Sequence, residues 1–191
     1  MYKFYMSKHN SGLPLTYNSW DLQEYEAIKK ILKSNILTQN KTVLKLEKEM
    51  AKYHNRKYCI MVNSGSSANL LGVAAMKYKK SLNIKDNDEF LVPGIGWSTS
   101  YSPFIQNNIN LKFIDVEEDT FNLKPEELEK KITKKTKGVL AINILGNPCN
   151  FTEIKKICKK NNLILVEDNC ESMGARFKKK LCGTFWFVVI S

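Results

Sequence analysis

The sequence predicts an α/β fold, one large domain or part of one, with a mostly parallel sheet flanked by helices. Short apolar runs alternate with segments of helical periodicity from about residue 21 to residue 168. The run 163–166 has the Leu, Ile and Val content of a strand that is buried on both faces. Two acids, Glu167 and Asp168, directly follow this run, and a polar turn comes after them. Open α/β sheets bind their ligands at such strand ends, so we expect a site there.

The first part of the chain predicts two helices, a strand and a third helix. Apolar residues recur at helical spacing over residues 21–34, where Ser19 or Asp21 is available as the N-cap, and again over about 43–53. The apolar run 58–62 predicts a strand. A turn of sequence NSGS then opens a helix over 67–78, whose small residues permit close approach to a sheet.

The second part continues the alternation. We expect strands at 89–92, 111–115, 138–144 and 163–168, and helices at 125–132 and 151–160. A short helical piece interrupted by Pro103 lies between the first two strands. Pro125 suits a first helical position, because a helix leaves that amide unpaired in any case. A sheet built from such alternating elements is mostly parallel and carries helices on both faces.

The composition is that of an ordinary soluble protein, with 43% apolar and 26% charged residues. The net charge of +11 invites a nucleic-acid interpretation, but only Arg56 and Arg176 among the 30 basic residues are arginines. A surface that reads nucleic acid favours arginine and gathers its charge on one face, whereas these lysines spread over several predicted helices. We therefore expect no nucleic-acid partner.

The cysteines and the chain start exclude other classes. Cys59, Cys149, Cys158, Cys170 and Cys182 show no CxxC spacing, so we expect reduced thiols and no metal site. The first ten residues contain no apolar signal-peptide core, and no run approaches the roughly 18 apolar residues of a membrane helix. These features predict a cytoplasmic protein with no membrane partner.

The turn NSGSSA, residues 63–68, lies between a predicted strand and a helix. Amides at a helix N-terminus face outward, and the helix dipole favours an anion there, so this turn can hold a phosphate. Gly65 permits the tight turn, and Ser66 and Ser67 add hydroxyl donors. A serine-rich helix cap explains the same residues equally well. The turn is neither a Walker P-loop nor a GxGxxG fingerprint.

Three more residues lie at the end of a predicted strand or follow one, and so fall at the same edge. Trp97 could stack on a flat ring or lie in the core beneath its loop. Asp168 could cap the next segment or face a pyridine nitrogen. A carboxylate keeps that nitrogen protonated, and the protonated ring then accepts electrons from a carbanion, as pyridoxal phosphate chemistry requires. Glu171 could reach the side of the ring that carries the phenolic oxygen.

Together, the motifs NSGSSAN, VPGIGWSTSYSP and VEDNCESMGARF resemble those of the DegT/DnrJ/StrS family of pyridoxal-phosphate-dependent nucleotide-sugar aminotransferases, from LPLTYNSWD through residue 185. The resemblance implies a type I aminotransferase fold with pyridoxal 5'-phosphate (PLP) or its amine form (PMP) as cofactor. It implies six cofactor-binding residues: Gly65, Ser66, Ser67, Trp97, Asp168 and Glu171. The first three would hold the phosphate, the tryptophan would stack on the ring, the aspartate would face the pyridine nitrogen, and the glutamate would lie beside the ring hydroxyl.

Within that family the chain resembles most the branch of 4-keto-6-deoxy-sugar 3-dehydratases, through these motifs and AINILGNP, and through Glu171 where many aminotransferases carry Gln. In that branch a His replaces the Schiff-base Lys. The family pattern continues past GTF, residues 183–185, to this Lys or His and then to a smaller domain, whereas here WFVVIS follows. We therefore expect residues 1–191 to be the N-terminal part of the PLP-binding large domain, with an aberrant or truncated end at 186–191, no catalytic residue and no activity alone.

The resemblance implies an enzyme that acts on a nucleotide-linked 4-keto-6-deoxyhexose, by transamination or 3-dehydration, in the synthesis of surface-polysaccharide and lipopolysaccharide sugars. It also implies a homodimer in the full-length form. Two alternatives stay open. One is a nucleotide-binding oxidoreductase domain of Rossmann type, against which the missing glycine fingerprint after Val62 argues. The other is a non-catalytic remnant, which the lack of a cooperative unfolding transition would reveal.

Overall fold

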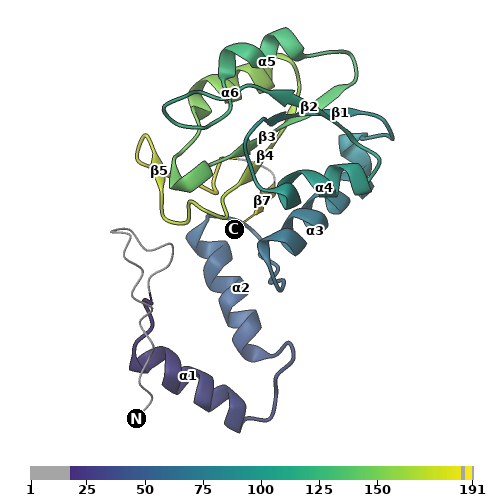
Figure 1. The fold of residues 1–191 in the computed structure, drawn as a ribbon. Coiled ribbons are helices and arrows are strands. Elements are labelled where there is room, and N and C mark those ends of the chain that lie inside the picture. The colour runs from purple at the N-terminus through teal and green to yellow at the C-terminus, as the bar shows by residue number, and fades with distance from the viewer. Residues whose placement is uncertain (1–17, 186–187, 191) are drawn as a thin grey trace. The chain divides into compact units, whose positions relative to one another are not determined.

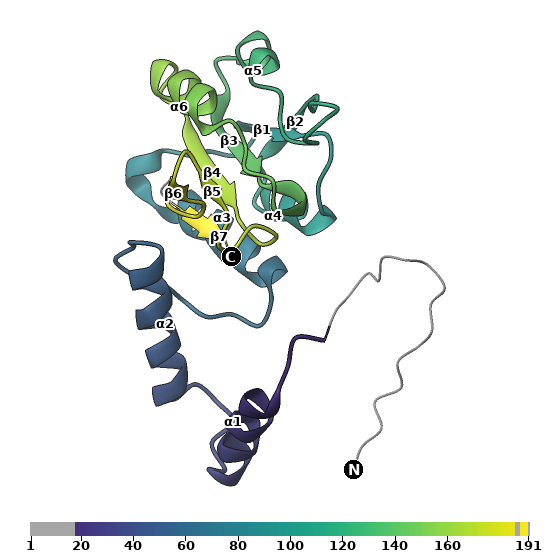
Figure 2. The same cartoon turned by 90° about the vertical axis from the view of Figure 1, so that its left-hand side faces the viewer.

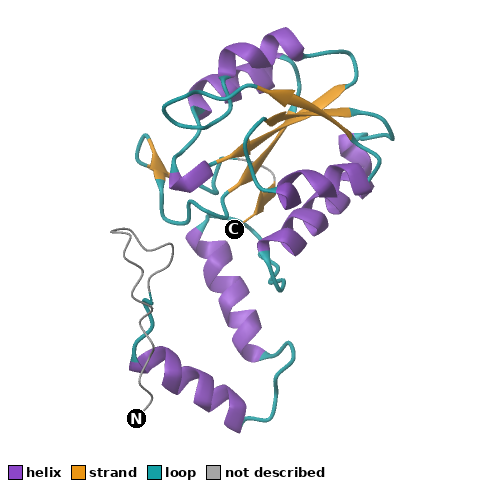
Figure 3. Cartoon of the chain, in the orientation of Figure 1, coloured by secondary structure: helices purple, strands orange, loops and turns teal. Residues whose placement is uncertain are grey.

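The computed structural model describes residues 18–185 and 188–190, in which helices alternate with parallel strands (Figure 1, Figure 3). The chain divides into two compact units, Met1–Leu44 and Lys45–Ser191. The first unit contains α1 (Leu22–Lys33) and the start of α2 (Lys41–Tyr53). Asp21 is the N-cap of α1: its carboxylate accepts from the amide of Gln23 at 2.7 Å, and its own amide donates to Glu24 Oε2 at 2.8 Å.

Five parallel strands form the main sheet of the second unit, in the order β2-β1-β3-β4-β7. Their bounds are β1 Glu89–Pro93, β2 Asn110–Ile114, β3 Thr136–Ile142, β4 Ile164–Asp168 and β7 Val188–Ile190. The chain runs from β1 outward to β2 and then returns to β3 on the other side of β1. The carboxyl ends of β1 and β3 therefore flank a topological switch point, where sheets of this kind bind ligands.

Helices cover both faces of this sheet (Figure 1, Figure 2). One face carries α3 (Gly65–Tyr78) and α4 (Ser98–Gln106), and the other carries α5 (Pro125–Lys131) and α6 (Phe151–Lys160). Successive strand side chains go to opposite faces, so Phe90 packs on the α3 and α4 side while Leu91 packs on the α5 and α6 side. The predicted fold class is confirmed.

Short elements complete the second unit. They are the 3-10 turns η1 (Lys80–Leu82) and η2 (Ile144–Gly146), and the hairpin of β5 (Arg176–Phe177) and β6 (Lys180–Leu181). Lys178 and Lys179 form the turn of that hairpin at positive φ. We expected an aberrant or truncated end at residues 186–191. Residues 186, 187 and 191 lie outside the described residues, and residues 188–190 form β7.

Two predicted strands need correction. The prediction of a strand at 58–62 is wrong, because no strand among the described residues pairs with this segment and so its backbone lacks a ladder. Instead the amide of Met61 donates to Glu47 Oε1 at 2.9 Å, and the side chain of Tyr58 is 74% exposed. The strand expected at 138–144 ends at Ile142, since Leu145 adopts a φ of 52° inside η2 and turns the chain.

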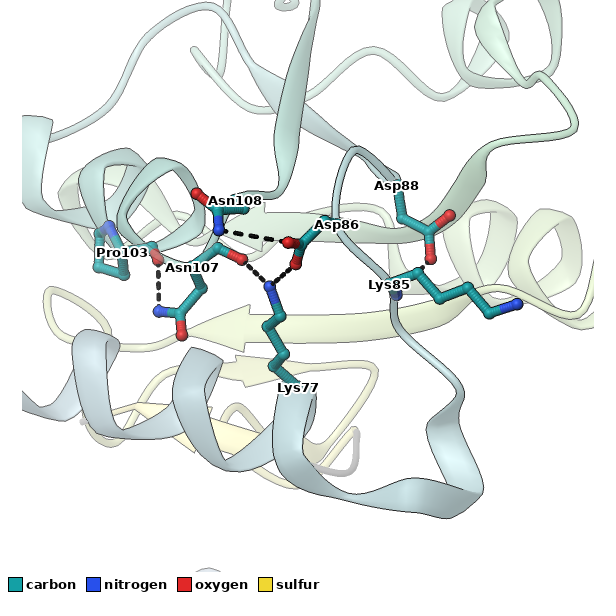
Figure 4. A network of polar contacts seen from close by, with 7 residues as sticks. All are labelled: Lys77, Lys85, Asp86, Asp88, Pro103, Asn107 and Asn108. Atoms are coloured by element: carbon teal, nitrogen blue, oxygen red, sulfur yellow. Dashed lines mark hydrogen bonds and ion pairs between the residues drawn. The ribbon is translucent and has the colours of Figure 1, made fainter.

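A polar network ties the C-terminal ends of α3 and α4 to the loop before β1 (Figure 4). Lys77 of α3, with a side chain only 18% exposed, donates to the carboxylate of Asp86 and to the carbonyl of Asn107. This donation holds the pKa of Asp86 below its ordinary value. The network fixes one end of each helix, and the opposite ends of the same two helices carry the residues of the site below.

In the described part of the chain, no helix has the length and apolar character needed to cross a membrane. All five cysteines are free. Residues 18–185 and 188–190 contain no group of three or more His, Cys, Asp or Glu side chains placed to hold a metal ion.

Candidate functional site

A cavity of about 170 Å³ opens at the carboxyl edge of the sheet. The ends of β3 and β4 and the starts of α3 and α4 contribute its lining, which is made of Gly65, Ser66, Asn69, Trp97, Thr99, Ser100, Ile142, Asp168, Cys170 and Glu171. Five of the six residues predicted from the sequence belong to this set, and Ser67 does not. The fold therefore gathers residues that are far apart in the chain around one space.

A larger hollow of about 630 Å³ lies elsewhere. Its lining includes Asp86, which precedes β1, Asn108, which precedes β2, and Asn110, the first residue of β2. The lining also includes Tyr101 of α4 and Phe113 near the end of β2, so this hollow follows the edge strand β2 and not the switch point between β1 and β3, where α/β proteins place their chemistry.

The turn before α3 uses one serine as a cap and leaves another to the cavity. Ser64 is the N-cap: its Oγ accepts from the amide of Ser67 at 3.2 Å and donates to the hydroxyl of Ser67 at the same distance. Capping thus occupies Ser67, which explains why it lies outside the cavity lining. The amides of Gly65 and Ser66 open the helix, where backbone donors have no intrahelical partner and the dipole favours an anion.

Asp168, the last residue of β4, is 4% exposed, and its carboxylate accepts three hydrogen bonds from nitrogen and oxygen donors. Its Oδ2 accepts from Ser100 Oγ at 2.8 Å and from Asn69 Nδ2 at 3.2 Å, and its Oδ1 accepts from the amide of Cys170 at 3.1 Å. Such donors stabilise the negative charge of a buried carboxylate. The site thus contains a fixed anionic acceptor at the strand end.

Trp97 and Glu171 complete the predicted set. Trp97 is the N-cap residue of α4 and stays 70% exposed, so the interpretation as a core tryptophan beneath its loop is wrong. It lines the cavity, where a flat ring can lie against an indole. Glu171 Oε2 accepts from the amide of Leu145 at 2.5 Å, which ties the segment after β4 to the segment after β3.

Two titratable side chains near Asp168 are held neutral. Burial, and then the charge of Asp168, raises the pKa of Tyr101 to about 12, and its hydroxyl donates to the carbonyl of Pro93 at 2.8 Å. The same two causes raise the pKa of Cys170 to about 12. A thiol must lose its proton to act as a nucleophile, so Cys170 is not a reactive thiol at neutral pH. The arrangement fits ligand binding rather than cysteine chemistry.

Sequence reasoning missed Asn69, Thr99 and Ser100, all of which line the cavity. Thr99 Oγ1 accepts from Ser66 Oγ at 2.9 Å, and the other two donate to Asp168. A signal was available, because Asn69 follows Gly65 by four positions and Ser100 follows Trp97 by three. Residues at such spacings share one face of a helix.

Comparison with known proteins agrees with this fold. The model of the DegT/DnrJ/EryC1/StrS aminotransferase family matches residues 18–190. The chain is 43% identical over 180 residues to GDP-4-keto-6-deoxy-D-mannose 3-dehydratase of Yersinia pseudotuberculosis, covering 94% of this chain and 46% of that enzyme. It is 45% identical over 172 residues to the enzyme of the same name from Escherichia coli O55:H7, covering 90% of this chain and 44% of that enzyme.

Solved structures give the same result. The E. coli GDP-4-keto-6-deoxy-D-mannose-3-dehydratase with bound hydrated PLP superposes with a TM-score of 0.86 at 45% identity, covering 90% of this chain and 44% of that chain. An aminotransferase from Psychrobacter cryohalolentis superposes with a TM-score of 0.76 at 28% identity, covering 85% and 40%. The chain spans a little under half the length of these relatives. It belongs to the DegT/DnrJ/EryC1/StrS aminotransferase family, not to the Rossmann-type oxidoreductases.

Proposed function

We propose that residues 1–191 form the N-terminal part of the large domain of a PLP-dependent enzyme and that the cavity binds PLP or PMP. One observation carries this proposal: a buried carboxylate, an indole and a helix N-terminus line the same cavity. The donor set fits the cofactor, since the helix start suits its phosphate, the indole suits its ring, and Asp168 suits a protonated pyridine nitrogen. Structures of relatives with bound PLP support the same assignment.

Each side chain has a distinct role in this proposal. The amides of Gly65 and Ser66 bind the phosphate, the Ser66 hydroxyl holds the turn through its bond to Thr99 Oγ1, and Ser67 contributes by its contact with the cap. Trp97 covers one face of the ring and excludes water from it. Asp168 holds a proton at the pyridine nitrogen, and Glu171 lies beside the ring hydroxyl. When bound, the cofactor supplies a protonated ring that accepts electron density from the substrate.

The substrate in this proposal is a nucleotide-linked 4-keto-6-deoxyhexose. Relatives named GDP-4-keto-6-deoxy-D-mannose 3-dehydratase and a Salmonella typhimurium relative named lipopolysaccharide biosynthesis protein RfbH support it. Relatives named GDP-perosamine synthase keep transamination as the second candidate reaction. The Lys or His that decides between these reactions is not matched within residues 1–191, so we propose that this chain alone is inactive.

We also propose a cytoplasmic enzyme that is a homodimer in its full-length form. Large apolar side chains stay exposed in the second unit, among them Tyr58, Ile60, Met61, Leu70, Leu71, Leu145 and Met173. Single exposed apolar side chains are normal on a monomer, so the proposal requires a partner subunit that covers several of these residues together. Sedimentation velocity is expected to show dimers or larger species, and a clean monomer at high concentration would count against self-association.

A charge placed at the helix start tests the phosphate site. Ser66→Asp is expected to lower the affinity of the chain for PMP by at least about tenfold, because a carboxylate there repels the phosphate at a cost of roughly 1.4 kcal/mol or more. Ser81→Asp, which makes the same change in the exposed turn η1, is the matched control and should bind like the wild type. Equilibrium dialysis with PMP measures both. Absence of binding by the wild-type chain, or equal binding by Ser66→Asp, would contradict the proposed function.

A further inference from the structure

Two buried side chains from two helices hold the Asp168 carboxylate. Ser100 of α4 and Asn69 of α3 both donate to Oδ2, at 2.8 Å and 3.2 Å. Ser100 is 3% exposed, and Asn69 and Asp168 are each 4% exposed. The amide of Cys170 donates to the other oxygen at 3.1 Å. Three elements, α3, α4 and the segment after β4, therefore fix one carboxylate.

These contacts leave a defined direction for a ligand. A carboxylate offers about four acceptor positions, and two fixed donors engage Oδ2 whereas one engages Oδ1. The Cys170 thiol also donates a hydrogen bond to Asp168, but a thiol is a weak donor that a charged nitrogen displaces. The acceptor position that remains for a ligand in the cavity is therefore on Oδ1.

The first turn of α4 connects this carboxylate to the start of α3. Thr99, next to Ser100, accepts from Ser66 Oγ at 2.9 Å. Adjacent residues of one helix thus bond to the residue proposed for the phosphate and to the residue proposed for the pyridine nitrogen. A rigid helix turn between these two contacts sets the separation of the two ends of the site.

We propose that Ser100 and Asn69 are positioning residues, which hold Asp168 with its open acceptor position toward the pyridine nitrogen of the cofactor. This inference rests on the proposed function. Without either donor the carboxylate gains rotational freedom, so it contacts the ring nitrogen for a smaller share of the time. The nitrogen then holds its proton less firmly.

The test compares Ser100→Ala, Asn69→Ala and Ser100→Thr with the wild type. Loss of a hydrogen bond to a charged group changes an equilibrium constant by about tenfold or more. Each alanine variant is therefore expected to bind PMP about tenfold more weakly. The absorbance of bound PMP, followed against pH, gives the midpoint at which the ring nitrogen loses its proton. In the alanine variants this midpoint should lie about one pH unit lower than in the wild type. Ser100→Thr keeps the hydroxyl and should restore that midpoint. Ser102→Ala, on the same helix and outside the cavity lining, is the matched control.

The outcomes separate this inference from the proposed function. If the alanine variants unfold at lower urea concentration but bind PMP with an unchanged midpoint, the two residues are merely structural and the inference is overturned. Should Ser100→Ala fail to fold, Asn69→Ala tests the same carboxylate from the other helix. If the wild-type chain binds no PMP, the proposed function fails and the inference falls with it. Binding by the wild type with an earlier midpoint in the variants supports both.

Discussion

Glu167→Ala is expected to lower the free energy of unfolding by about 3–5 kcal/mol, which is the usual cost of leaving buried partners of a charged group unpaired. Glu167 is fully buried in β4 beside Asp168. Its Oε1 accepts from the amide of Gly183 at 2.7 Å and from Asn143 Nδ2 at 3.1 Å, and its Oε2 accepts from the amide of Phe185 at 3.2 Å. Alanine removes the acceptor for all three donors. The amides of Gly183 and Phe185 then lose their acceptor on the sheet.

Urea denaturation measures this loss. The matched control is Glu129→Ala, in which a partly exposed glutamate of α5 loses only an ion pair with Lys160. Exposed pairs contribute at most about 1 kcal/mol. Equal losses in the two variants would show that Glu167 does not anchor the amides of Gly183 and Phe185.

The stability contribution of Glu167 also depends on pH. Burial raises its pKa above the ordinary 4.5, although its hydrogen bonds and the charge of Arg56 oppose the shift. The folded state therefore binds this proton more tightly than the unfolded state does. Stability from this group is fully present below pH 4.5 and declines as pH rises from there through the raised value. Glu167→Gln should remove this decline, and parallel stability curves for wild type and variant would contradict it.

Asp168→Asn is expected to weaken PMP binding by about ten- to a hundredfold, the range of one charge-assisted hydrogen bond. The amide keeps the shape of the side chain but lacks the charge that stabilises a protonated pyridine nitrogen. Asp115→Asn makes the same change just after β2, at the same edge of the sheet and outside the cavity lining. Equilibrium dialysis should show normal affinity for that control. Equal affinity of Asp168→Asn and wild type would remove Asp168 from the site.

Local patterns predicted most of the fold. Helix α6 was expected at 151–160 and spans Phe151–Lys160, because its apolar spacing and flanking polar residues agree with its packing. The segment 58–62 has an apolar run of the same quality, yet it forms no strand. Strand formation depends on a partner that is remote in sequence, and composition does not report that partner.

Some residues of the site could also be predicted from the sequence, and others could not. Trp97 and Asp168 could be predicted because Trp97 follows β1 and Asp168 ends β4, and the carboxyl ends of parallel strands share an edge. Asn69 and Ser100 lie inside helices, and their role depends on how α3 and α4 pack over β4. Ser67 could not be assigned from the motif alone. Its amide donates to the side chain of Ser64, the N-cap of α3, and the presence of a hydroxyl in the sequence does not reveal this contact.

A crystal structure of this chain with PMP tests the central claim most directly. We expect the pyridine nitrogen to lie within about 3 Å of the Asp168 carboxylate, as in a charge-assisted hydrogen bond. We also expect the phosphate at the amides of Gly65 and Ser66, and the ring against Trp97. A cofactor bound outside this cavity, or bound with its phosphate toward Asp168, would contradict it.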